Sequence, residues 1–479
     1  MTAIILSLIL ILGLFFPFTL LALALYQFYH YNFRKRSYRK LDLKPIIGFT
    51  EQHSVTQGDS IPIYIHTTDD ANLKVYRLSS KRESTSLNMS IARIEQSNVY
   101  HHWKGFDWPP TLEIDTVDLQ EGLYAIELRQ NSFPKHAFSL PLIVSPKEVV
   151  SLALVSSTNT WDAYNAFGGL SNYIDNVTPF PLRLFHYTAT HLACWLIARG
   201  HIFPLVPLPL RRPDTSLDTE LRNLSATPHE PHCSHKLRAE WSLCGFLETH
   251  GIAHGLFTDR DWAFGHLPHR AKLVIFHAHS EYWSVEMVAR LDQYLRQGGS
   301  VLFLSGNNIW QKVEFDQHGL TVKEDFDVHE TARRIGAAFD RRGYNTAAGY
   351  RVIQSDHWVF NGLDLKDGDR FGIDTANRAY PDLPGASGSE VDKINLGSGE
   401  FTVLSIGENP GGGAFMVYRE TGHGGFIFNA ASILFTGGLG HDCVIEGIVK
   451  NLIEKALAPT ESDSNALHAK DSHQMHPVS

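Results

Sequence analysis

Three polar segments of the chain contain the residue types that could do chemistry, and each follows an apolar run of strand length. They span residues 158–173, 277–284 and 305–308. If the strand before the second segment continues through it, its two-residue period places His277, His279 and Glu281 on one face. Imidazole and carboxylate groups arranged in this way can bind a metal ion or act as a general acid and base. Polar loop residues that hydrogen-bond to neighbouring turns would have the same composition, so the spacing alone leaves both interpretations open.

The elements around these segments predict that the segments meet. Apolar runs of strand length occupy residues 149–156, 272–276 and 300–304, and helical periodicity marks residues 188–199, 236–250 and 285–297. This alternation predicts an α/β fold with a mostly parallel sheet. In open parallel sheets, ligands bind beyond the carboxyl ends of the strands. The three polar segments are therefore expected at one edge of the sheet.

The order and intervals of these segments resemble the C-terminal domain of the N,N-dimethylformamidase large subunit. The motifs that carry the resemblance are Asn159-Thr-Trp-Asp-Ala-Tyr-Asn165 with Gly168-Gly169, His279-Ser-Glu-Tyr-Trp-Ser284, Gly298-Gly299 and Phe303-Leu-Ser-Gly-Asn307. The resemblance covers about residues 148–457, and the β-rich region before it is similar in kind to the β-sandwich of that family. Such α/β domains are in turn similar to class I glutamine amidotransferases. The expected fold is thus a parallel, glutamine amidotransferase-like sheet.

What the resemblance implies is a mononuclear iron site held by two tyrosines and one glutamate. Such a site hydrolyses a small N-substituted formamide to formate and an amine. Carried onto this chain, the glutamate falls on Glu281, and the supporting histidine and asparagine fall on His279 and Asn307. Iron bound in this way would polarise the amide carbonyl and activate water. His279 would then pass a proton to the leaving amine, and Asn307 would donate a hydrogen bond to the oxyanion.

The two tyrosine ligands implied by the resemblance differ in how directly they match. The first falls on Tyr164. The second is expected in residues 181–187, which makes Tyr187 the candidate and Tyr173 the alternative. Either tyrosine could instead be an aromatic residue that packs under a loop. Asn307, similarly, is of a residue type that is common in turns.

Two features of the chain depart from the family. Ser280 stands where the family usually has an aspartate before the glutamate, so the charge around the ion is expected to differ. The second departure is a predicted membrane anchor, described below, which the soluble N,N-dimethylformamidase lacks. That enzyme also works with a small partner subunit. A small subunit or a homo-oligomer is therefore a possible partner, besides an amide substrate.

The N-terminal segment predicts a membrane anchor. Residues 3–25 contain no charged residue, and the mainly apolar character continues to residue 31. A run of this length can cross a hydrocarbon core of ~30 Å as a helix. The basic residues that follow it are Arg34, Lys35, Arg36, Arg39, Lys40 and Lys44. By the positive-inside rule, the sequence predicts a single-pass membrane protein with a helix at residues 3–31 and its soluble domain in the cytoplasm.

The remaining regions complete the predicted organisation. Residues 46–145 contain short β-rich runs separated by turn residues, which is typical of a small β-sandwich. The N,N-dimethylformamidase-like domain is expected at residues 148–457, followed by a polar, disordered tail at residues 459–479. The net charge of -9 is spread thinly and offers no basic face, which argues against nucleic acid as a partner.

Two other classes of function compete with amide hydrolysis. A glutamine amidotransferase mechanism needs a cysteine on a tight strand-to-helix turn, and none of Cys194, Cys233, Cys244 and Cys443 is predicted there. The stronger alternative is a non-catalytic, membrane-tethered binding or scaffold protein that keeps a pocket for an amide or sugar. Iron content and hydrolysis of small amides distinguish this alternative from the enzyme.

Overall fold

The structure is a computed structural model, and it describes most of the chain between residues 38 and 459. The described residues are 38–169, 171, 208–224, 227–228, 236–267, 271–316, 318–340, 342, 345–373, 375, 384–397 and 399–459. The predicted membrane span at residues 3–31, the two tyrosines Tyr173 and Tyr187, and nearly all of the predicted tail lie outside them. Strand residues outnumber helical residues in the described part.

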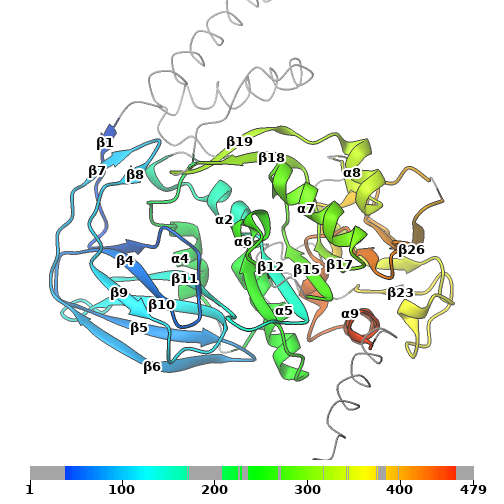
Figure 1. The fold of residues 1–479 in the computed structure, drawn as a ribbon, viewed down its shortest axis with the longest axis horizontal. Helices are drawn as coiled ribbons and strands as arrows, with labels where there is room; N and C mark the ends of the chain where they lie inside the picture. The colour runs from blue at the N-terminus through cyan, green and yellow to red at the C-terminus, as the bar shows by residue number, and fades with distance from the viewer. Residues whose placement is uncertain are drawn as a thin grey trace, which may run out of the picture.

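The N-terminal region is built from three small sheets around one apolar core (Figure 1). The five-stranded sheet runs in the order β3 (Ser54–Thr56), β11 (Ala137–Ser145), β10 (Gly122–Gln130), β5 (Ala71–Leu78) and β6 (Arg82–Ile91). The three-stranded sheets are β2 (Ile46–Phe49), β4 (Ser60–Thr67) and β9 (Leu112–Asp115), and β1 (Tyr38–Lys40), β7 (Val99–His101) and β8 (Gly105–Phe106). The division of the chain into domains stays a prediction.

A nine-stranded mixed sheet forms the centre of the second region. Its order is β14 (Gly255–Thr258), β12 (Leu152–Ser156), β15 (Leu273–Ala278), β17 (Ser300–Ser305), β28 (Phe426–Asn429), β27 (Phe415–Glu420), β26 (Thr402–Gly407), β22 (Tyr350–Val352) and β23 (Arg370–Phe371). The four pairs from β14 to β28 are parallel. The four pairs from β28 to β23 are antiparallel.

The predicted fold class is therefore wrong, because the sheet is mixed and is not the mostly parallel, glutamine amidotransferase-like sheet that was expected. The physical reason lies in the connections. A parallel neighbour needs a crossover of a dozen or more residues, whereas β27 and β28 are joined directly by residues 421–425. The apolar runs in this part of the chain predicted strands, but an apolar run does not show whether a strand pairs parallel or antiparallel with its neighbour.

Helices cover both faces of the parallel half of the sheet (Figure 1). On one face, Leu273 and Ile275 of β15 share a core with α5 (Leu237–Thr249) and α9 (Cys443–Leu457). On the other, Val274 and Phe276 share a core with α6 (Asp259–Phe264) and α7 (Val285–Arg296). Successive strand residues point to opposite faces, and helices cover both faces here. Residues 273–276 are therefore apolar without interruption.

Smaller elements surround the carboxyl ends of the parallel strands. A four-stranded sheet contains β13 (Leu208–Pro209), β19 (Gly319–Asp325), β18 (Gln311–Phe315) and β16 (Tyr282–Trp283). Two-stranded sheets pair β20 (Ala338–Phe339) with β25 (Asp392–Ile394), and β21 (Thr346–Ala348) with β24 (Ser387–Ser389). The other helical segments are α2 (Thr158–Tyr164), η2 (Phe167–Gly169), α4 (Thr215–Arg222), α8 (Val328–Ile335), η3 (Trp358–Phe360) and η4 (Phe435–Gly438).

The membrane prediction is corrected as well. Within the residues that the structure describes, no helix is both long enough and apolar enough to span a bilayer. The segment that prompted the prediction, residues 3–31, is outside those residues. A single-pass membrane localisation is accordingly not retained.

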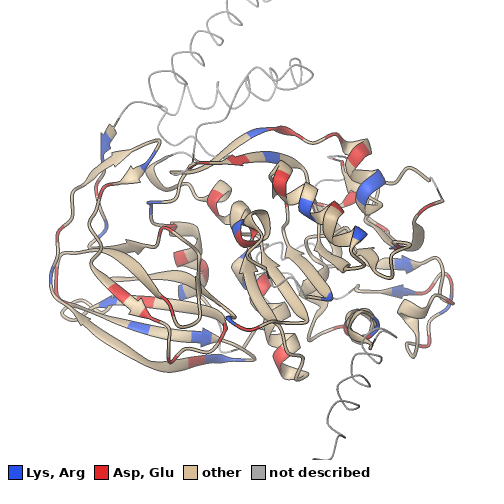
Figure 2. Ribbon diagram, in the orientation of Figure 1, with Lys and Arg blue, Asp and Glu red and all other residues tan. Residues whose placement is uncertain are grey.

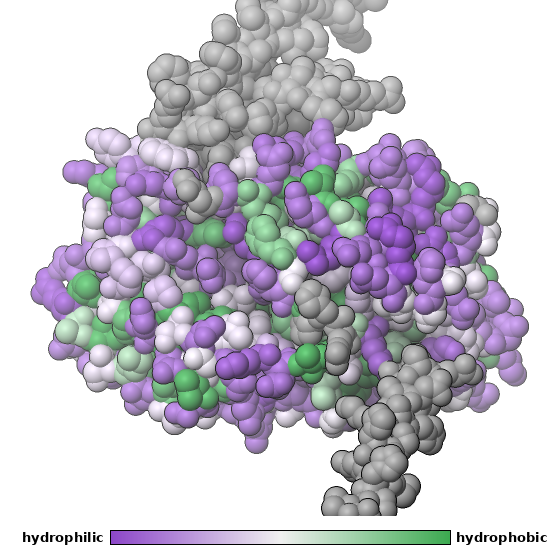
Figure 3. Space-filling model, in the orientation of Figure 1, coloured by the Kyte–Doolittle hydropathy of each residue, from purple (hydrophilic) through white to green (hydrophobic). Residues whose placement is uncertain are grey.

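Charged and apolar residues are both spread over the molecule in the view of Figures 2 and 3. Basic and acidic residues are dispersed among uncharged ones along the ribbon in Figure 2. Apolar side chains occur in small groups among hydrophilic ones in Figure 3. Scattered apolar residues of this kind are normal on a folded surface, so this face gives no argument for an apolar docking site.

Candidate metal and hydrolytic site

His279 and Glu281 lie in the short connection between β15 and β16. Ala278, the last residue of β15, has a φ of 62°, a left-handed conformation that non-glycine residues adopt at a cost of about 1–3 kcal/mol. The Thr160 hydroxyl donates to the His279 carbonyl oxygen at 2.7 Å. The strand therefore stops at Ala278, and the following backbone is held against α2.

This turn separates His277 from the other two residues, against the predicted alternation. His277 is still within the strand and is paired in register with Leu304 of β17. It is fully buried, and burial, together with nearby His254, lowers the pKa of its imidazole to about 3. His279 and Glu281 instead gather with a third residue, Glu390.

Tyr164 reaches this group from the last residue of α2. Its hydroxyl donates to Oε2 of Glu281 at 2.9 Å. Its ring meets that of His279 edge-on, with the centroids 5.5 Å apart and an angle of 89° between the ring planes. The structure thus brings together three of the residues that the resemblance implied, from two segments more than a hundred positions apart.

Buried carboxyls hold the amino end of α2 in place. Asp259 accepts from the Asn159 amide at 2.9 Å, and Glu240 accepts from the Ser157 amide at 3.0 Å and from Nε1 of Trp161 at 3.1 Å. The helix has no side-chain cap of its own at Ser157. The first turn of a helix leaves amides without intrahelical partners, and these carboxyls bind them, which fixes the direction in which Tyr164 points.

A stability prediction follows from Glu240. Burial raises the pKa of its carboxyl to about 8, against 4.5 for the ordinary group. The folded state thus binds more protons than the unfolded state between these values, so this group lowers stability as the pH rises from about 4.5 toward 8. We expect Glu240→Gln, which mimics the protonated carboxyl, to raise Tm at pH 8 more than at pH 5. Thermal unfolding at both pH values measures this, and an equal shift at both would contradict it.

Asn307 comes from the turn after β17. Its φ is 53°, and its Nδ2 donates to Oε2 of Glu390 at 2.7 Å. It is 2% exposed, and its Oδ1 has no hydrogen-bond partner among the described residues. Asn307 is therefore part of the same buried group as His279 and Glu281, and it meets that group through Glu390.

Glu390 is the site residue that the sequence reasoning missed. It lies between the short strands β24 and β25, and its Oε2 is 3.1 Å from Nε2 of His279. No apolar run of strand length precedes it, so no strand end was expected there. The one local signal is an acidic residue after small residues, Ala386-Ser-Gly-Ser-Glu390. Small residues of this kind allow two backbones to approach closely.

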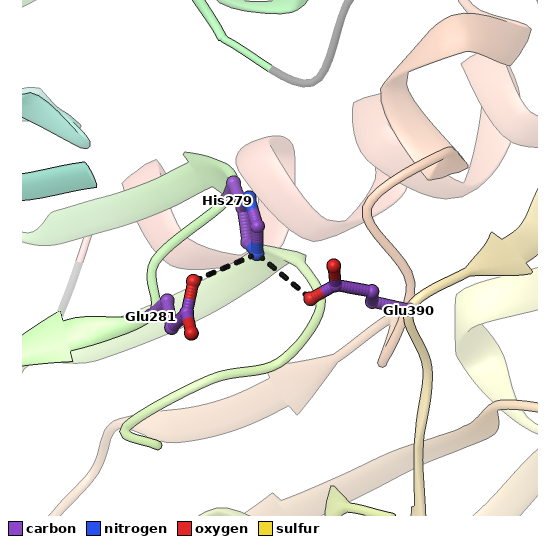
Figure 4. Close-up of side chains that lie close together, drawn as sticks. All are labelled: His279, Glu281 and Glu390. Atoms are coloured by element: carbon purple, nitrogen blue, oxygen red, sulfur yellow. Dashed lines mark hydrogen bonds and ion pairs between the residues drawn. The ribbon is translucent and has the colours of Figure 1, made fainter. Parts of the chain in front are cut away.

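The three titratable side chains form a compact group (Figure 4). One ligand atom from each of His279, Glu281 and Glu390 lies within 4.8 Å of the other two. Nε2 of His279 points between the carboxylates, 3.4 Å from Glu281 and 3.1 Å from Glu390. All three side chains are buried. The group thus offers one imidazole and two carboxyl groups, all buried.

The electrostatics of the group follow from burial and crowding. Burial raises the pKa of Glu281, and the nearby charge of Glu390 raises it further, against the effects of His279 and Tyr164. For His279, burial opposes the charged imidazolium. The charge and hydrogen bond of Glu390, with the charge of Glu281, outweigh it and raise the pKa of His279. Two carboxylates therefore favour positive charge between them, on a protonated imidazole or on a cation.

Comparison with known proteins places the chain in a family. The family described as N,N-dimethylformamidase beta subunit-like, C-terminal, matches residues 72–334 and 323–445. These ranges include Tyr164, His279, Glu281, Asn307 and Glu390. Since they cover well over half of the chain, it belongs to this family of N,N-dimethylformamidase-like proteins.

Other comparisons add little. No curated protein matches the chain. Among the solved structures that match is a crystal structure of Paenibacillus sp. cycloisomaltooligosaccharide glucanotransferase complexed with cycloisomaltoheptaose, at 12% identity. The match covers 25% of this chain and 17% of that chain, with a TM-score of 0.15. A likeness that weak carries no argument about fold or ligand.

Proposed function

We propose that this chain is a metal-dependent amide hydrolase that cleaves the C–N bond of a small N-substituted formamide or a related linear amide. The observation that carries the proposal is the group around Glu281, whose Oε2 lies 2.9 Å from the Tyr164 hydroxyl and 3.4 Å from Nε2 of His279. This group lies in a chain of the N,N-dimethylformamidase-like family. Membership supports amide hydrolysis, and the group supplies residues that could perform it.

The donor atoms fit a hard cation such as iron. Tyr164 and Glu281 present a phenolic and a carboxylic oxygen 2.9 Å apart. Carboxylate oxygens suit hard cations, and a cation favours the ionised form of Glu281, which burial otherwise opposes. Tyr164 and Glu281 would hold the ion. Tyr187, or alternatively Tyr173, is proposed as the third ligand by resemblance, and both lie outside the described residues.

A bound cation of this kind would polarise the amide carbonyl and lower the pKa of an attacking water. The protein's own residues then handle protons. His279, protonated at Nε2 between Glu281 and Glu390, is placed to give that proton to the leaving amine nitrogen. Glu390 orients the imidazole through its 3.1 Å contact and can accept a proton at Oε2 from the attacking water.

Asn307 is placed to stabilise the developing oxyanion. Its amide nitrogen carries two hydrogens, of which one binds Glu390 at 2.7 Å. The second can donate to an oxygen that becomes negative during the reaction. Its left-handed backbone and its burial restrict the side chain to this direction. A donor fixed in advance in this way stabilises the transition state without reorganisation.

The experiment that tests the function uses the full-length protein. Its iron content is measured, and hydrolysis of N,N-dimethylformamide, N-methylformamide and formamide is followed by formate release. Chelation should abolish hydrolysis and added iron should restore it. Protein that binds no iron and hydrolyses none of these amides would contradict the proposal and favour a non-catalytic ligand-binding protein.

The proposed role of Tyr164 as a phenolate ligand can be tested separately by spectroscopy. A tyrosine phenolate bound to iron gives a visible charge-transfer band. We expect Tyr164→Phe to weaken or abolish this band, because the variant keeps the ring but lacks the oxygen that lies 2.9 Å from Glu281. The visible spectrum of iron-loaded protein measures it. Tyr294→Phe is the control, since that partly buried tyrosine donates to the Ala271 carbonyl. A band unchanged in Tyr164→Phe would remove this residue from the metal site.

A further inference from the structure

Asn308 and Asp392 lie immediately behind the candidate site and bind each other. Nδ2 of Asn308 donates to Oδ2 of Asp392 at 2.6 Å, and the Asn308 amide donates to Oδ1 at 3.3 Å. The two residues are 1% and 0% exposed. Nδ2 of Asn308 also donates to the Ser305 carbonyl oxygen at 3.0 Å. The pair therefore ties the end of β17 to the start of β25.

The pair joins the two chain segments that carry Asn307 and Glu390. Asn308 follows Asn307 directly, and Asp392 lies two residues after Glu390. The hydrogen bond between Asn307 and Glu390, 2.7 Å long, therefore spans the same two segments as the bond between Asn308 and Asp392. Neither segment is a long strand or helix that would fix its side chains by itself.

The segment that carries Asn307 has an unfavourable backbone conformation, which needs other contacts to hold it. Asn307 and Ile309, on either side of Asn308, have φ values of 53° and 50°. Left-handed non-glycine residues persist when surrounding contacts over-determine them. Two such residues around Asn308 indicate that the bonds to Asp392 hold this turn in its conformation.

The two segments also touch backbone to backbone at Gly306. A Cβ added at Gly306 would lie 2.6 Å from the Glu390 carbonyl oxygen and 2.6 Å from the Ile433 amide nitrogen. The absence of a side chain at Gly306 thus allows the Glu390 backbone to approach the end of β17. Placement of the Glu390 carboxylate depends on this approach and on the bond between Asn308 and Asp392 that secures it.

We propose that Asn308 and Asp392 are positioning residues that set the separation between Asn307 and Glu390 and so align both with the reacting amide. The proposal rests on the amide hydrolase function proposed above for Asn307 and Glu390. Neither positioning residue contacts His279 or Glu281 through a hydrogen bond in the described residues. Their hydrogen bonds therefore reach the reaction through Asn307 and Glu390, while the charge of Asp392 also helps to raise the pKa of His279.

The test compares Asp392→Asn with a matched control in the full-length protein. The variant replaces one carboxylate oxygen, which accepts from Asn308, by an amide group that donates. The hydrogen bonds between Asn308 and residue 392 should therefore weaken. We expect kcat to fall by about 10- to 100-fold, as is typical for residues that orient a reacting group, while KM and bound iron change little. A purely structural role would lower Tm and leave kcat of the folded protein unchanged.

Asp218→Asn is the control. Asp218 on α4 is fully buried and accepts from the Ser139 amide at 2.9 Å, away from the site. It should lower Tm without changing kcat. Asn308→Ser removes the side-chain donor to Asp392 but keeps the Asp392 charge that acts on His279, so it should also lower kcat if the pair acts by positioning, and it replaces Asp392→Asn if that variant does not fold.

Crystal structures of wild type and variant separate this proposal from the proposed function. A lost or lengthened bond between Asn307 and Glu390, together with the lower kcat, supports the positioning role. An unchanged bond, or an unchanged kcat in an active enzyme, overturns it. If the wild type hydrolyses no amide, the hydrolase function fails, and the Asn307–Glu390 bond alone decides whether the pair positions these residues.

Discussion

Glu281→Gln is expected to remove bound iron and to lower amide hydrolysis by more than about 100-fold, since loss of a residue that merely orients a ligand already costs about 10- to 100-fold. Glu281 is 3% exposed and accepts the Tyr164 hydroxyl. Glutamine has the same size but no negative charge, so it cannot neutralise a cation. Burial of the carboxylate without a cation is itself unfavourable, as the raised pKa of Glu281 indicates.

Metal analysis and kcat/KM of the purified variant measure this effect. Glu248→Gln serves as the control, because Glu248 on α5 pairs with Arg77 at 2.8 Å on the opposite side of the sheet from α7. It should keep iron and activity. Full iron content in Glu281→Gln would mean that Glu281 is not a ligand.

Glu390→Gln is expected to lower kcat by about 10²- to 10⁴-fold, the range for loss of a general acid or base, while iron remains bound. Oε2 of Glu390 accepts from Asn307 at 2.7 Å and lies 3.1 Å from Nε2 of His279. A neutral amide can keep one of these contacts but cannot stabilise a charged imidazolium or accept a proton.

Paired measurements of iron content and kcat distinguish Glu390 from Glu281. Loss of turnover with iron retained identifies a proton-transfer or orienting role for Glu390. Loss of iron from Glu390→Gln would instead make Glu390 a ligand, which its position beside Glu281 also allows geometrically. Wild-type turnover in the variant would contradict either role.

The parts of the fold that were predictable from sequence are those with strong local patterns. The apolar runs at residues 149–156, 272–276 and 300–304 correspond to β12, β15 and β17, and the capped helix after Ser284 corresponds to α7. These strands are parallel to one another. Their carboxyl ends hold the segments with Tyr164, His279 and Asn307, as the rule for parallel sheets predicts.

The antiparallel half of the sheet was not predictable in the same way. The mostly apolar residues of β26 and β27 predict strands but are compatible with a parallel or an antiparallel neighbour, and the length of the connection distinguishes the two. The prediction that His277 shares a face with His279 and Glu281 was wrong for a different reason. The sequence does not mark Ala278 as left-handed, so the end of the strand, and with it the separation of His277 from the site, could not be foreseen.

Glu390 could not be found from sequence because its contacts are long-range. It meets His279 across 111 positions and Asn307 across 83. Its neighbours form strands of three residues, which are too short to give a periodic signal. The residues near long apolar strands could be predicted from their motifs. Glu390, which completes the group, is identified only by the tertiary structure.

The most direct test of the central claim is the position of iron in crystals of the full-length protein, located by anomalous diffraction at the iron absorption edge. The account predicts one peak within bonding distance of both the Tyr164 hydroxyl oxygen and a Glu281 carboxylate oxygen. Iron-loaded crystals with no peak near these two atoms, or with iron bound only elsewhere, would contradict it.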